Sequence, residues 1–137
     1  MTRWTVEYEG ASFERFYRRL PDHAQAVLAA AIENVLAVHG MDVCSGEWGK
    51  ALGGGLYEFR IRRSLNTILT SAGLEKSTDV AADRPTLLRV FCTFHGDRIV
   101  LLFHGYDKGR DPSAQRQRRE IAKARKLHDA WKRRDDR

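Results

Sequence analysis

The chain has 137 residues, 42% of them hydrophobic, which is enough for one domain with its own core. Its two cysteines, Cys44 and Cys92, lie far apart and outside any Cys/His cluster, which argues against a disulfide framework or a zinc site. No apolar run suggests a membrane span and no signal-peptide core follows Met1, so we expect a cytoplasmic protein with no membrane partner, metal or cofactor.

The net charge of +6 is unevenly placed along the chain. Residues 108–137 carry 12 Lys/Arg and 5 Asp/Glu, a net +7, whereas residues 1–107 sum to −1. A polyanionic partner such as a nucleic acid would explain this asymmetry. A solvated basic tail, or a tail that docks on an acidic protein, would explain it equally well.

The first forty residues predict a strand followed by two helices. Residues 4–8 alternate apolar and polar, the period of a half-buried strand. Ser12 is expected to cap a helix over 13–20, and Asp22 a second helix that Gly40 stops. Because only Pro21 and Asp22 separate them, we expect the two helices to form a hairpin.

The middle of the chain predicts one clear strand between less regular segments. Residues 41–55 are Gly-rich and predict a loop, whereas 56–62 alternate strictly, with Glu58, Arg60 and Arg62 on one face. Residues 65–70 either extend this strand or start another. Residues 71–85 predict a long mobile loop.

The last third predicts a β-hairpin and a basic helix. Residues 87–95 and 99–106 are strand-like, with a tight turn at 95–98 between them. Asp111 is expected to cap the final helix, with Pro112 at its first position and an apolar stripe ending in Trp131. The order of strand, helix pair, antiparallel strands and helix predicts a single α+β domain.

Arginines gather on one predicted sheet face. Alternation places Arg89 opposite the apolar side chains of its strand, and if that strand neighbours 56–62, Glu58, Arg60, Arg62 and Arg89 share a face. Guanidinium groups beside a cleft grip phosphates bidentately and stabilise the charge that develops in phosphoryl transfer. Ordinary exposed arginines, one of them paired with Glu58, are equally compatible with the pattern.

The end of the last predicted strand concentrates groups able to do chemistry. Metal-free RNA cleavage needs a base for the 2′-hydroxyl, cations for the phosphorane and an acid for the leaving oxygen, roles that His104, Tyr106, Lys108 and Arg110 could share. Alternatively, His104 is a core histidine hydrogen-bonded under the sheet and Tyr106 a packing residue. Lys108 and Arg110 lie where a loop meets a helix, a frequent functional location.

Four segments carry a family likeness in chain order. They are Lys50-Ala51-Leu52 with 55–61 (GLYEFRI), 88–91 (LRVF), 99–108 (IVLLFHGYDK), and Pro112 with 120–124 (EIAKA). Together they resemble HigB-like, phage-derived toxins of the RelE/ParE superfamily. With the N-terminal strand and helix hairpin, the resemblance covers nearly all of the chain except residues 64–86.

The resemblance implies a RelE-like fold over 1–137: an N-terminal strand and helix hairpin, a twisted antiparallel sheet, a C-terminal basic helix, and a loop insertion at 64–86. It implies the toxin of a type II toxin–antitoxin system, a ribosome-dependent mRNA endonuclease that needs no metal and inhibits translation. A cognate antitoxin, expected to be a helix-turn-helix protein, would neutralise the toxin. The toxin would bind operator DNA only through this antitoxin.

The expected site residues follow from the motifs and the charge pattern. The catalytic set is Arg89, His104, Tyr106, Lys108 and Arg110, and the RNA-binding set is Lys50, Arg60, Arg62, Arg116, Arg118, Arg119 and Lys123. No tyrosine follows Arg110, so Tyr106 would take the place of the C-terminal aromatic of RelE. The alternative is a ParE-like gyrase-inhibiting toxin or a non-catalytic nucleic-acid-binding module. An exposed Arg89 cluster in a cleft would favour cleavage, and a buried Arg89 would favour binding.

Overall fold

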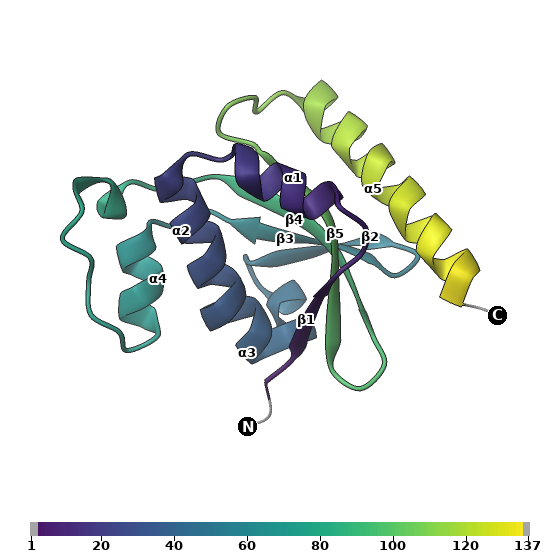
Figure 1. Ribbon diagram of the computed structural model, residues 1–137, viewed down its shortest axis with the longest axis horizontal. Coiled ribbons are helices and arrows are strands. Elements are labelled where there is room, and N and C mark those ends of the chain that lie inside the picture. The colour runs from purple at the N-terminus through teal and green to yellow at the C-terminus, as the bar shows by residue number, and fades with distance from the viewer. Residues whose placement is uncertain (1–2, 136–137) are drawn as a thin grey trace.

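A five-stranded mixed sheet with helices on both faces forms the protein (Figure 1); the computed structural model describes residues 3–135. The strand order is β1-β5-β4-β3-β2, with β1 at Thr5–Tyr8, β2 at Gly49–Gly53, β3 at Leu56–Ile61, β4 at Leu88–His95 and β5 at Ile99–Asp107. The α+β class is confirmed. The expected all-antiparallel sheet is wrong in one pairing, because β1 runs parallel to β5. No hairpin joins these two strands, so their connection does not force an antiparallel arrangement.

The N-terminal helices cover one face of the sheet. Helix α1 (Ser12–Arg19) and helix α2 (Asp22–Ala31) form the expected hairpin, and the helical path continues through a π-turn, η1 (Ile32–Leu36), into α3 (Ala37–His39). The caps differ from expectation: Ser12 is the first residue of α1 and Asp22 the first of α2, preceded by Ala11 and Pro21. Ser12 turns its hydroxyl to His104 instead of to its own helix.

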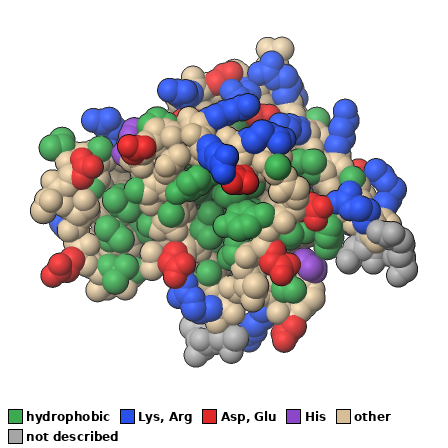
Figure 2. All heavy atoms as spheres, in the orientation of Figure 1, with side chains coloured by type: hydrophobic (Ala, Val, Ile, Leu, Met, Phe, Trp, Pro, Cys, Tyr) green, Lys and Arg blue, Asp and Glu red, His purple; other side chains and the backbone are tan. Residues whose placement is uncertain are grey.

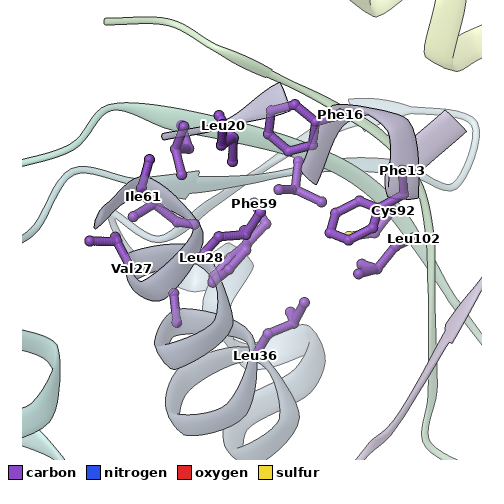
Figure 3. Packing of buried hydrophobic residues seen from close by; sticks show 14 of the residues in the cluster. Phe13, Phe16, Leu20, Val27, Leu28, Leu36, Phe59, Ile61, Cys92 and Leu102 are labelled. Atoms are coloured by element: carbon purple, nitrogen blue, oxygen red, sulfur yellow. The ribbon is translucent and has the colours of Figure 1, made fainter. Parts of the chain in front are cut away.

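The main core lies between these helices and the sheet (Figure 3). Phe13 and Phe16 of α1 and Leu28 of α2 meet Phe59 and Leu102 of the sheet, all of them buried. At roughly 25 cal/mol per Å² of apolar surface removed from water, burial of such side chains is the dominant stabilising contribution. The apolar side chains of both helices therefore face the sheet.

One helical run is more apolar than expected. Residues Asp22–Ser45, which end in the 3₁₀ turn η2 (Gly40–Ser45), are long and apolar enough to cross a membrane, by length and composition only. This corrects the expectation that no run reaches that length. Its Ala24, Val27 and Leu28 lie in the core against the sheet, and the core helix of a soluble protein passes the same test.

The segment 64–86 is helical where the sequence predicted a strand and a mobile loop. Helix α4 (Leu65–Ser71) begins at Ser64, whose hydroxyl accepts a hydrogen bond from the Thr67 amide, and η3 (Val80–Asp83) is a 3₁₀ turn. Buried Asn66 fastens the intervening chain: its amide donates to Asp83 (2.9 Å) and accepts from the Ser77 backbone N–H (2.7 Å). These bonds order residues 64–86 beside α2.

Helix α5 (Ala114–Asp135) covers the other face of the sheet. It begins after Ser113, whose hydroxyl accepts from the Arg116 amide, so the cap lies two residues beyond the predicted Asp111. Arg125 donates to the backbone oxygens of Leu52 and Gly53. Those two residues belong to β2, a strand where the sequence predicted only loop.

Candidate functional site

A buried ion network links the central strands below α5. Arg60 of β3 lies directly opposite Arg89 of β4, and Arg89 lies opposite Tyr106 of β5. The predicted shared face is confirmed for Glu58, Arg60 and Arg89, whereas Arg62 lies past the end of β3. Glu58 is fully buried and holds the Arg60 Nε at 2.8 Å and the Arg89 Nε at 3.6 Å. One carboxylate thus neutralises part of the charge of two guanidiniums.

Arg89 is a buried residue and not the exposed cation that a substrate would touch first. Only 3% of it is exposed, and burial, with Arg60 and Arg62 nearby, lowers its pKa although Glu58 opposes this. Its Nε and Nη1 have no hydrogen-bond partner within the described residues. Of the two arrangements anticipated from the sequence, this burial is the one that favours binding over cleavage.

Lys108 lies at the rim of this network, just past the end of β5, and is half-buried. Its pKa is lowered first by burial, then by the positive charge of Arg89, with Arg60 and Arg62 adding to the effect and Glu58 opposing it. Cations from the ends of the two neighbouring strands β3 and β4 therefore lie near the lysine that follows β5. A lowered pKa increases the share of neutral amine, the form of lysine that can accept a proton.

A cleft of about 280 Å³ lies along the free edge of β5, between α1 and the first turns of α5. It exists because β1 ends opposite Leu102, so no strand covers residues 103–107 on that side. Five basic side chains line it: Arg15, Arg19, Arg110, Arg116 and Lys123. The sequence predicted the last three. It missed Arg15 and Arg19, whose spacing of four residues on a helix was the available signal.

His104 lies at the floor of the cleft and ties α1 to α5. Its Nδ1 is 3.0 Å from the Ser12 hydroxyl and its Nε2 is 3.4 Å from both carboxylate oxygens of Glu120. Burial lowers the pKa of the imidazole, as does Lys123, while Glu120 opposes them. Because both ring nitrogens have protein partners, His104 matches the core histidine of the alternative interpretation.

Tyr106 is almost completely buried, with 1% exposed, and lies between the network and the cleft. Its ring stacks on Phe91, and the Arg116 guanidinium lies over it at 5.3 Å. A β-bulge at Phe91 and Cys92 leaves Phe103 and His104 both on the α5 side of the sheet, and Tyr106 follows on the same side. His104 and Tyr106 therefore lie on the same side of the sheet.

The other predicted residues lie apart from this region. Lys50 is exposed on β2, at the opposite edge of the sheet from the cleft. Arg118 and Arg119 are exposed on α5 and do not line the cleft. Figure 2 shows blue Lys and Arg side chains gathered over α1 and α5.

Comparison with protein family models, with curated proteins and with solved structures finds no match for this chain. Within residues 3–135, no group of three or more His, Cys, Asp and Glu side chains is placed to hold a metal ion. The resemblance to HigB-like toxins therefore stays a prediction carried by the four sequence motifs.

Proposed function

We propose that this protein is a RelE/HigB-type toxin that binds mRNA on the ribosome in the cytoplasm, cleaves its backbone without a metal and so inhibits translation. The observation that carries the proposal is the gathering of Arg60, Arg62 and Arg89 around Lys108, at the ends of three adjacent strands. An antitoxin, expected to be a helix-turn-helix protein, would neutralise it and alone connect it to operator DNA.

In the proposed reaction Lys108 removes the proton of a 2′-hydroxyl. The 2′-oxygen then forms a bond to the adjacent phosphorus and the bond to the 5′-oxygen breaks, leaving a 2′,3′-cyclic phosphate and a 5′-hydroxyl that takes up a proton. Arg62 and Arg110, both exposed, contact the phosphate and stabilise the charge of the phosphorane. Arg89 keeps the pKa of Lys108 low without touching substrate, and is a positioning residue.

The test is induction of the protein in cells, followed by mapping of mRNA ends, for Lys108→Met and for Lys126→Met. Lys126 is an exposed lysine of α5 outside the cluster and serves as the matched control. We expect Lys108→Met to lower the cleavage rate about 10²–10⁴-fold, the usual contribution of a general acid or base, and the control to cleave normally. Equal cleavage by both variants would contradict the assignment of Lys108.

A second candidate is binding without cleavage, by a nucleic-acid-binding module or a ParE-like gyrase inhibitor. The observation that favours it is the burial of Arg89, together with the engagement of both nitrogens of His104. Growth arrest with intact mRNA and induced DNA damage would support the gyrase-directed alternative. Tight RNA binding without cut ends would support the binding module.

A further inference from the structure

The cleft beside β5 is built by segments from opposite ends of the chain. Helix α1 contributes Arg15 and Arg19, and helix α5 contributes Arg116 and Lys123. Both arginines of α1 and Lys123 are exposed side chains, so they can reach a ligand without rearranging the core. The basic side chains over α1 and α5 in Figure 2 mark this side of the molecule.

The charge in the cleft is not balanced by the protein. Five cations line it against two carboxylates, those of Asp107 and Glu120. The Arg116 Nε forms an ion pair with Glu120 Oε2 at 3.3 Å. In contrast, Arg15, Arg19 and Lys123 make no ion pair with any residue of 3–135. Like charges that converge in a concave site repel one another and attract an anion.

A buried group without a partner marks the same place. The Tyr106 hydroxyl has no hydrogen bond to any described residue, although Tyr106 lines the cleft and is 1% exposed. Buried hydroxyls in native proteins are nearly always satisfied, by protein, water or ligand. A phosphate oxygen in the cleft would be one acceptor that satisfies it.

We infer that Arg15, Arg19 and Lys123 form a second phosphate-binding site, which holds another phosphate of the RNA strand that is cleaved beside Lys108. The choice of RNA as the source of the phosphate rests on the proposed function. Arg110 lines the cleft and follows Lys108 by two residues, so one strand passes from the first site to the second without leaving the protein.

The pKa of the His104 imidazole should change when an anion occupies the cleft. Lys123 and Arg116 lower the pKa of His104, Glu120 raises it, and the Ser12 hydroxyl occupies its other nitrogen. A bound phosphate offsets the nearby positive charges, including those of Arg15 and Arg19, and therefore raises the pKa of His104 toward its ordinary value. The same linkage requires phosphate to bind more tightly at lower pH.

The experiment uses the full chain as wild type, as the double variant Arg15→Ala/Arg19→Ala, and as Arg18→Ala. Arg18 lies on the same helix outside the cleft and pairs with Glu14, so it is the matched control. NMR titration of His104 with and without inorganic phosphate is the first measurement. The salt dependence of binding to a single-stranded oligoribonucleotide is the second. Thermal melts check that the variants fold.

We expect phosphate to raise the pKa of His104 in the wild type and in Arg18→Ala, and to leave it nearly unchanged in the double variant. The slope of log K against log salt should fall by about 0.7 in the double variant, since the second site holds one phosphate and each phosphate contact on single strands contributes about 0.7. An unmoved imidazole, or a wild-type slope in the double variant, overturns the second site. Loss of cleavage on Lys108→Met would still stand in that case, so the two failures are distinguishable. Phosphate binding in a wild type that binds no RNA overturns RNA as the ligand of the second site, whereas the proposed function on the ribosome is decided by the mapping of mRNA ends.

Discussion

Removal of the charge of Glu58 should destabilise the protein severely. Glu58 is fully buried and forms an ion pair with Arg89, which is itself 3% exposed. The variant Glu58→Gln keeps the shape but leaves a buried guanidinium without a counter-charge, a change that costs about 3–5 kcal/mol in comparable sites. For a chain of this size the expected fall in Tm is roughly 10–20 °C.

The assay is urea unfolding of Glu58→Gln, Arg89→Met and the double variant, which together form a double-mutant cycle. Because Arg89→Met removes the stranded charge, the double variant should recover most of the stability lost in Glu58→Gln. Substitution of a buried ion pair by apolar groups is often neutral. A loss below about 1 kcal/mol in Glu58→Gln, or no recovery in the double variant, would refute a structural ion pair at this position.

Three further outcomes are expected. Gly40→Ala should lower the free energy of unfolding, measured in urea, by roughly 2–4 kcal/mol, because Gly40 has φ +55° and an added Cβ would lie 1.9 Å from the Trp4 ring. A near-neutral variant would contradict this packing. The free energy of unfolding should decrease as pH falls below the ordinary imidazole pKa of 6.5. Burial lowers the pKa of His104 and His128 in the folded state, so the unfolded state binds protons more readily than the folded state. Each imidazole adds at most about 1.4 kcal/mol per pH unit, and a flat profile between pH 7 and 5 would argue against both shifts. Ser113→Ala should cost about 1 kcal/mol, measured by thermal melt, because it removes the hydroxyl that accepts from the Arg116 amide; an unchanged Tm would show that α5 needs no cap.

Periodicity predicted most of the regular elements. Strand β3, the β4–β5 hairpin and helix α5 lie where alternation or helical spacing placed them, because each presents one apolar face to a core. Helix α4 was missed because Thr67, Ile68 and Thr70 are β-branched residues that favour strands locally. Tertiary packing beside α2 and the capping hydroxyl of Ser64 decide the outcome there.

The site was less predictable than the fold. Alternation placed Arg60 and Arg89 on one face, but it carries no information on depth, and α5 together with Glu58 makes Arg89 a buried residue. The contribution of α1 was out of reach, because Ser12 and His104 are 92 positions apart. Because β1 ends opposite Leu102, α1 can lie against the edge of β5 beyond that residue.

The pairing of β1 with β5 also determines when the molecule can take shape during synthesis. Ribosomes add about 5–20 residues per second, so β1 and α1 wait roughly 5–20 s before β5 emerges and offers them an edge. Until then the apolar face of α1 has α2 but no sheet to cover. The basic cleft is thus a late product of folding, and a nascent chain that stops before β5 has none of the chemistry described for that edge.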